Sequence, residues 1–210
     1  MHEKVLPQHS LELLSDLEKD GSPLLSNWTL AGGTGLAFRL AHRVSEDLDF
    51  FRTDELDVRR LHDVLAKHGN YETLQEAEHT LTVLIRNTKL SFFRVRDPFL
   101  FQPDPYRFFS IAAIGDIALM KLAAISSRGS RKDFADLFTI LQALPSLEVY
   151  FDMLPQKYGV SRVNTYHILK SLTYFDDAEA EPMPQMLVPF DWKECKAFFI
   201  RQARAIVLQS

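Results

Sequence analysis

The sequence predicts an α+β fold, with a mixed or antiparallel sheet and flanking helices in its first half and a helical subdomain in its second half. Two observations support this prediction. Segments with the apolar spacing of helices alternate with segments of strand-like alternation up to about residue 96. After a proline-containing connection at 97–108, the apolar spacing becomes helical. We expect two parts, 1–110 and 111–210, that together form one compact unit.

The elements of the first half follow from local patterns. Leu13, Leu14 and Leu17 lie at helical spacing before Gly21, which predicts a first helix. The next segments alternate as strand, helix, strand and helix: 28–33, 34–41, 47–51 and 58–69. Three runs then alternate apolar and polar residues, which predicts neighbouring antiparallel strands: 71–79, 80–87 and 88–96.

The second half has the texture of a helical subdomain. Its predicted helices occupy these ranges: 114–126, 130–144, about 146–157, about 164–178 and 191–208. A proline-rich stretch at 181–189 separates the last helix from the others. Asp191 and Glu194 have the spacing of a capping box at the start of that helix.

Composition limits the functional classes. The 210 residues are 46% hydrophobic and 25% charged, as expected of a globular chain, and the single cysteine, Cys195, excludes an internal disulfide framework. We find no basic and apolar leader and no apolar run long enough for a membrane span. We therefore expect a cytoplasmic protein with no membrane association. A net charge of −4 argues against indiscriminate nucleic-acid binding but permits a local basic site.

Two aspartates interrupt an apolar strand in "AGGTGLAFRLAHRVSEDLDFF", residues 31–51. Side chains alternate along a strand, so Asp47 and Asp49 share one face while Leu48 and Phe50 point into the core. Their Cα atoms then lie roughly 7 Å apart. Paired carboxylates of this kind suit Mg²⁺, which keeps part of its coordination for water and substrate phosphates. Alone, such a triplet is more often a solvated strand end.

The adjacent glycines supply a second component. A turn without side chains lets the backbone N–H groups of Gly32, Gly33 and Thr34 approach phosphates at the start of the next helix. Alone, these residues also fit a simple tight turn or helix cap. The combination of this turn with the aspartate pair, separated by one short helix, points more strongly to a nucleotide site.

The segment 32–51 resembles the AbiEii/AbiGii toxin family, within the polymerase β-like nucleotidyltransferase superfamily. That family combines a GGT-type turn, an HRxSxDLDFF-like segment, a lysine on a later helix and an R(K/R)DFxDL-like segment. The later elements here are "DIALMKLAAISSRGSRKDFADL", residues 116–137. The resemblance spans about 28–200. It implies a nucleotidyltransferase-like core at 1–110, with the helical subdomain at 111–210 completing the active-site cleft.

The resemblance also gives meaning to a second group of polar residues. Lys121 lies in the most apolar stripe of its predicted helix, where a structural ion pair is the alternative to a catalytic role. Asp133 and Asp136 are helical neighbours, and an N-terminal cap is the alternative explanation for Asp133. The resemblance implies that Lys121 is catalytic, that Asp133 is catalytic or orients the lysine, and that Asp136 supports them.

Three further residues are candidates for nucleotide binding. Arg131 stands at the start of its helix, where it would contact phosphate or simply be solvated. Arg43 and Ser45 precede the aspartates and have the same two interpretations.

One departure from the wider superfamily concerns the metal. Many members carry a third acidic residue on a following strand, but the segment 88–96 offers only Lys89 and Ser91. Either one Mg²⁺ arrives largely with the nucleotide, or another acid such as Asp133 contributes to the site.

The activity implied by the resemblance is Mg²⁺-dependent transfer of a nucleoside monophosphate from a nucleoside triphosphate to an acceptor hydroxyl, with release of pyrophosphate. It further implies an RNA acceptor, in particular tRNA, and a cognate antitoxin. Basic residues on the strands would form an RNA-binding rim or be merely solvated: Arg86, Lys89, Arg94, Arg96 and Arg107. The alternatives are transfer to a small molecule or a protein, and a non-catalytic binding module.

Overall fold

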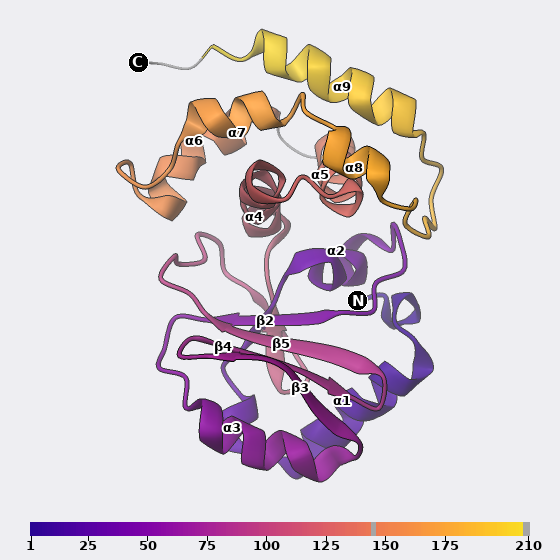
Figure 1. The fold of residues 1–210 in the computed structure, drawn as a ribbon, viewed down its shortest axis with the longest axis vertical. Helices are drawn as coiled ribbons and strands as arrows, with labels where there is room; N and C mark the ends of the chain where they lie inside the picture. Colours follow the sequence, from indigo (N-terminus) through magenta and orange to yellow (C-terminus); the bar gives the residue numbers. More distant parts are fainter. Residues whose placement is uncertain (144–145, 208–210) are drawn as a thin grey trace. The chain divides into compact units, whose positions relative to one another are not determined.

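The computed structural model describes residues 1–143 and 146–207 (Figure 1). The chain divides into two compact units, Met1–Ala113 and a second that begins at Ile114. The sequence predicts this boundary near residue 110.

Unit 1 is built on a seven-stranded mixed sheet with the strand order β3-β4-β5-β2-β1-β7-β6. The strands are β1 Thr29–Leu30, β2 Leu48–Arg52, β3 Tyr71–Ala77, β4 Thr80–Ile85, β5 Thr88–Arg94, β6 Asp104–Tyr106 and β7 Phe109–Ile111. As predicted, β3, β4 and β5 are antiparallel neighbours. Strand β2 runs parallel to β5 and antiparallel to β1, which is parallel to β7. The predicted α+β class with a mixed sheet is confirmed.

Three α-helices and three short 3-10 helices accompany this sheet. They are η1 Glu3–Val5, α1 Gln8–Asp20, η2 Pro23–Leu25, α2 Gly32–Leu40, α3 Val58–Leu65 and η3 Ala66–His68. Gly21 ends α1 in the left-handed conformation, and Asp57 caps α3 by accepting a hydrogen bond from the N–H of Arg60. Figure 1 shows α1 and α3 on one side of the sheet and α2 on the other.

The core of unit 1 fixes which way β2 faces. Leu48 and Phe50 are buried, and Phe50 stacks on Phe92 of β5 with ring centroids 5.2 Å apart. Trp28 packs edge-on against the same Phe92 ring. Because strand side chains alternate, Asp49 is turned to the opposite face, where it is only partly buried.

The segment 97–108 differs from the expected irregular connection. It contains β6, which pairs with β7 and forms one edge of the sheet. Pro105 lies within β6, and an edge strand tolerates proline because one side of its backbone needs no ladder hydrogen bond. The proline obscured this strand in the sequence.

The described part of unit 2 is built of helices, with a single bridge residue at Met186. Its helices are α4 Ile114–Ser127, α5 Arg131–Ala143, α6 Leu147–Tyr158, α7 Thr165–Ser171, α8 Asp176–Ala180 and α9 Trp192–Ala205. The helix expected at 164–178 is instead two helices. A turn after Ser171 closes with a hydrogen bond from Thr173 N to Lys170 O, and acidic residues then favour the start of α8.

The ends of two predicted helices, at Leu144 and Leu208, lie outside the described residues. The predicted cap at the start of α9 is present, because the Asp191 carboxylate accepts a hydrogen bond from the N–H of Glu194 at 2.9 Å. The core of unit 2 includes Phe134, which contacts the rings of Phe175, Trp192 and Phe199.

The lengths and hydropathies of the helices bear on whether any of them could span a membrane. Within 1–143 and 146–207, no single helix is long and apolar enough to cross a bilayer. Only α5 and α6 taken together, across a sharp bend, reach the required length and composition.

Candidate active site

The glycine turn and the aspartate strand of unit 1 are in direct contact. Helix α2 begins at Gly32, two residues earlier than predicted, and Gly32 has a φ of +63°. A Cβ atom at this position would lie 3.0 Å from Oδ2 of Asp49. The N–H of Ala31 also donates to the carbonyl oxygen of Asp49 at 3.0 Å. The carboxylate therefore lies against the first residue of the helix, where a side chain would crowd it.

Arg43 occupies the space beside the second glycine. A Cβ atom at Gly33 would come within 2.1 Å of a guanidinium nitrogen of Arg43, which is 4% exposed. The guanidinium also donates to the carbonyl oxygen of Val44 at 3.0 Å. A buried cation next to the N-terminus of a helix produces a positive environment, and such an environment favours bound phosphate.

The Thr34 hydroxyl fastens the segment before β2 to this helix start. It lies 2.7 Å from the Ser45 hydroxyl and donates a hydrogen bond to the carbonyl oxygen of Asp47. The first intrahelical hydrogen bond of α2 runs from Gly35 N to Ala31 O, so the N–H groups of Gly32, Gly33 and Thr34 precede the helical ladder. The side chain of Thr34 thus positions the chain, while its backbone belongs to the turn.

The Asp47 carboxylate is about half exposed, and Asp49 is partly buried. Asp47 immediately precedes β2, and its Oδ2 lies 3.9 Å from the ammonium of Lys89, with both side chains about half exposed. An ion pair of this exposure contributes little to stability. Asp47 can therefore exchange this contact for a cation at little cost.

The register of β2 and β5 explains the departure noted in the sequence. Asp49 pairs with Ser91, so the neighbouring position on the next strand carries a buried hydroxyl and no carboxylate. Among the described residues, no group of three or more His, Cys, Asp or Glu side chains is arranged to hold a metal. The donor set fits one Mg²⁺ held by two carboxylates, with phosphate and water oxygens as the remaining ligands.

The second group of polar residues forms a buried network within unit 2. The Lys121 ammonium lies 2.8 Å from Asp133 Oδ1 and 2.6 Å from Asp136 Oδ2. The lysine side chain is 5% exposed, and neither carboxylate is exposed. The structure therefore brings Lys121 of α4 together with Asp133 and Asp136 of α5. Helical spacing predicted that the two aspartates are neighbours, and the family resemblance implied that Asp133 orients the lysine.

Asp133 is the centre of this network. It accepts hydrogen bonds from Arg128 at 2.7 and 3.0 Å and from the Ser130 hydroxyl at 2.9 Å, besides its contact with Lys121. Burial by itself raises the pKa of Asp133, but the Lys121 ammonium and the Arg128 guanidinium outweigh it and hold the pKa at about 2. Ser130 also caps α5, so Asp133 combines the capping and the lysine-orienting interpretations.

Arg131 does not fit the nucleotide-binding role expected for it. Its guanidinium donates to the carbonyl oxygens of Ala178 and Glu179 and lies over the Trp192 ring. The side chain is only 12% exposed. These contacts give Arg131 a structural role, which is to fasten α8 to α5. The partners stand more than 40 residues later, where local sequence reasoning could not connect them.

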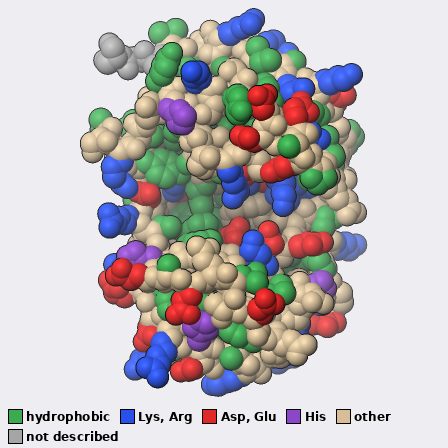
Figure 2. All heavy atoms as spheres, in the orientation of Figure 1, with side chains coloured by type: hydrophobic (Ala, Val, Ile, Leu, Met, Phe, Trp, Pro, Cys, Tyr) green, Lys and Arg blue, Asp and Glu red, His purple; other side chains and the backbone are tan. Residues whose placement is uncertain are grey.

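The strand arginines proposed for an RNA-binding rim are largely paired with acids of unit 1. Arg86 binds Asp16 at 2.7 Å, and Arg94 binds Glu55 at 2.6 Å. Arg107 contacts Glu3 at 2.9 Å. Figure 2 shows Lys and Arg side chains interspersed with Asp and Glu side chains over the face in view. These observations favour the alternative of solvated, locally balanced arginines.

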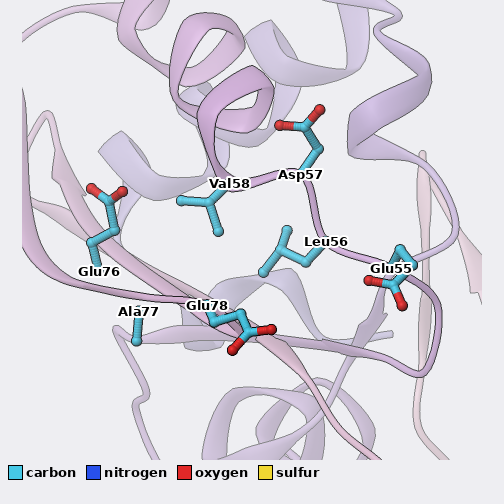
Figure 3. A pocket seen from close by; sticks show the side chains of 7 residues that line it. All are labelled: Glu55, Leu56, Asp57, Val58, Glu76, Ala77 and Glu78. Atoms are coloured by element: carbon cyan, nitrogen blue, oxygen red, sulfur yellow. The ribbon is translucent and has the colours of Figure 1, made fainter.

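A surface hollow of about 790 Å³ lies elsewhere in unit 1 (Figure 3). Four carboxylates line it, from Glu55, Asp57, Glu76 and Glu78. Glu55 lies beyond the end of β2, whereas Asp49 stands near its start. The acidic lining would repel a triphosphate, so the hollow is not the nucleotide site.

Comparison with known proteins identifies the family. The family model described as nucleotidyl transferase AbiEii toxin, Type IV TA system, matches residues 15–206. The chain belongs to the AbiEii nucleotidyl transferase toxin family. This confirms the resemblance seen in the sequence motifs, and nucleotidyl transfer is the activity of the family.

The chain is also similar to individual proteins. The uncharacterized protein aq_aa25 of Aquifex aeolicus (strain VF5) is 35% identical over 189 residues, which cover 86% of this chain and 88% of the relative. MenT4, a nucleotidyltransferase toxin from Mycobacterium tuberculosis H37Rv, is similar in structure with a TM-score of 0.55 at 14% identity, covering 95% of this chain and 88% of its own. JHP933 from Helicobacter pylori gives a TM-score of 0.52 at 15% identity, over 97% and 92%. At such identities these two structures show a shared fold.

Sequence reasoning missed several contacts of this AbiEii chain. The sequence placed Lys89 on an RNA-binding rim, at a stretch where related proteins carry an acidic residue, but did not indicate its contact with Asp47. It also did not indicate the ion pair between Arg128 and Asp133. It also overlooked a second buried ion pair, between Lys157 and Asp116, at 2.8 Å. Helix α6 also contains Glu148, Asp152 and Gln156, so no local pattern singles out Lys157.

Proposed function

We propose that this protein transfers a nucleoside monophosphate from a nucleoside triphosphate to a hydroxyl of an RNA acceptor, with tRNA as the acceptor class. The observation that carries the proposal is the contact between Gly32 and Asp49, with Arg43 beside Gly33. A phosphate-binding turn and a pair of carboxylates for Mg²⁺ thereby occupy one place in unit 1. We assign Lys121 and Asp133 to the reaction as well, on the order of the family's motifs.

The residues of unit 1 act mainly by binding and orienting the substrate. The backbone N–H groups of Gly32, Gly33 and Thr34 donate hydrogen bonds to the phosphates, and Arg43 and Ser45 hold the turn in position. Asp47 and Asp49 would hold Mg²⁺, which when bound polarises the α-phosphate and stabilises the charge on the attacking and leaving oxygens. The acceptor oxygen then forms a bond to the α-phosphorus as the bond to pyrophosphate breaks.

Lys121 contributes a fixed positive charge. Its two carboxylate partners hold the ammonium in one position, because both contact distances are short. Lys121 would stabilise charge on the triphosphate, while Asp133 orients the ammonium and Asp136 supports it. The low pKa of Asp133 keeps its own carboxylate ionised at neutral pH.

The proposed setting follows from the family description. A Type IV toxin-antitoxin system implies a cognate antitoxin and a nucleoside triphosphate as substrate. We propose a cytoplasmic location, where nucleotides and tRNA are available and the single thiol stays reduced.

The decisive experiment incubates the purified protein with each labelled nucleoside triphosphate, Mg²⁺ and total RNA or tRNA. We expect label on RNA, and Asp47→Ala or Asp49→Ala should reduce transfer at least about 100-fold. Asp63→Ala, an exposed carboxylate on α3, is the matched control and should leave the rate unchanged. Label on protein or on small molecules, with none on RNA, would show that the acceptor is not RNA. Activity that survives both site substitutions would refute the assigned site.

A further inference from the structure

We propose that Phe51 and Phe93 form a stacking platform for a nucleobase next to Asp49. This inference deepens the proposed function and rests on it, because it assigns a substrate subsite to the same face of the sheet.

The register of two parallel strands places the two rings together. Phe51 of β2 pairs with Phe93 of β5, two residues beyond the pair formed by Asp49 and Ser91. The rings stack with centroids 5.2 Å apart and an interplanar angle of 27°. Residues two apart on a strand share a face, so the aromatic pair and the Asp49 carboxylate are on the same side of the sheet.

The packing of the core does not account for these two rings. Their neighbours Phe50 and Phe92 are 1% and 2% exposed and belong to the hydrophobic core of unit 1. Phe51 and Phe93 point the other way and remain partly exposed. Strands β2 and β5 thus place Phe51 and Phe93 on the face that carries the aspartates, in addition to the two phenylalanines in the core.

The order of side chains along this face matches the order of groups in a nucleotide. Asp47 and Lys89 form a charged row, Asp49 and Ser91 a second polar row, and the two phenylalanines a third, apolar row. Successive rows are about 7 Å apart. A nucleotide likewise carries its phosphates and its flat base on opposite sides of the ribose. With the reacting phosphate at the carboxylates, a base can reach the aromatic row.

Stacking on aromatic rings suits any base, because every base has a flat π-face. Both reactants carry one: the nucleoside triphosphate and the terminal nucleotide of the RNA. The shared chemistry is therefore a nucleobase, and separate measurements on the two substrates distinguish the sources.

The first test measures steady-state kinetics of Phe51→Leu and Phe93→Leu. Leucine keeps an apolar side chain but removes the ring, so we expect KM to rise about 5- to 150-fold for one substrate, with a smaller change in kcat. Phe51→Tyr should restore KM, whereas a purely packing role would not distinguish Leu from Tyr in this way. Leu74→Ala, an exposed apolar residue on β3, is the control. If the wild type transfers nucleotides and neither KM changes more than twofold in the leucine variants, the platform is refuted while the proposed function stands.

The second test needs neither activity nor a substitution. The wild-type protein is irradiated with 8-azido-ATP or with RNA that ends in 4-thiouridine, and the linked peptides are mapped by mass spectrometry. We expect linkage within β2 or β5 at Phe51 or Phe93, which also decides the matter if the leucine variants fail to fold. Linkage elsewhere, or no linkage, contradicts the platform. Linkage at these rings in a protein that transfers no nucleotide supports the platform and refutes the proposed reaction.

Discussion

Asp49 lies against Gly32 so closely that a Cβ atom on the glycine would be 3.0 Å from the carboxylate oxygen Oδ2. This contact joins the start of α2 to the start of β2. It explains why a glycine is needed at position 32. The backbone there has a positive φ, and the Asp49 carboxylate occupies the space that a side chain would need. The geometry of the turn and that of the proposed metal-binding pair are therefore coupled.

The first prediction separates these two demands on Gly32. Gly32→Ala should destabilise the protein by about 1–2 kcal/mol through the left-handed backbone and should also displace Asp49, so that transfer falls more than tenfold. Gly21→Ala has nearly the same φ of +65°, but its Cβ would meet only the Lys19 carbonyl oxygen at 4.0 Å. It should lose similar stability and keep its activity. Equal activity losses in the two variants, measured on folded protein, would show that Asp49 is unaffected by position 32.

A second prediction concerns the fit between Gly33 and Arg43. Gly33→Ala forces the guanidinium away, since a Cβ atom would lie 2.1 Å from one of its nitrogens. Gly33→Ala and Arg43→Ala should each raise KM for the nucleoside triphosphate, and the double variant should be no worse than the more impaired single variant. A double-mutant cycle measures this coupling. Strictly additive effects would mean that Arg43 does not act through its position beside Gly33.

Local patterns were sufficient to predict most elements, because an amphipathic helix or an alternating strand is encoded by near neighbours. The pairing of Gly32 with Asp49 could be suspected from motif spacing, but the side-chain contact could not. Arg131 shows the opposite case. Its sequence position at a helix start suggested a phosphate ligand, yet its partners on α8 and in Trp192 are distant in sequence. Strand β6 was not predicted, because a proline such as Pro105 indicates a turn unless the strand is known to lie at the edge of the sheet.

A third prediction distinguishes Lys121 from an ordinary buried lysine. Lys121→Met removes the buried ammonium that contacts Asp133 and Asp136, while Arg128 still contacts Asp133. Lys157→Met likewise removes the buried ammonium that lies 2.8 Å from Asp116. Each should cost about 3–5 kcal/mol in the free energy of unfolding, measured in urea. Only Lys121→Met should abolish transfer by the protein that remains folded. Comparable activity in the two variants would assign Lys121 a structural role alone.

A fourth prediction follows from the contacts of Arg131. Arg131→Ala removes hydrogen bonds to the carbonyl oxygens of Ala178 and Glu179, which should lower the free energy of unfolding by about 1–3 kcal/mol. KM for the nucleoside triphosphate should stay within twofold of the wild type. Hydrogen exchange should show faster opening of α8. A large increase in KM for the nucleoside triphosphate, with no change in the hydrogen exchange of α8, would instead support a nucleotide-binding role for Arg131.

The last prediction uses the low pKa of Asp133. The folded-state pKa of about 2 lies below the ordinary value of 3.8, so the ionised form binds more tightly in the folded state. Its stabilisation is present in full above about pH 5 and is lost as the pH falls from about 4 to 2, with a total of about 2 kcal/mol. Asp133→Asn should therefore be less stable than the wild type at pH 7, and the difference should shrink as the pH is lowered to 2.5. The exposed Asp152→Asn serves as the control, and its urea unfolding curve should follow that of the wild type at each pH. A difference for Asp133→Asn that stays constant between pH 7 and 2.5 would contradict the linkage, because protonation of Asp133 abolishes the charge that Lys121 and Arg128 stabilise.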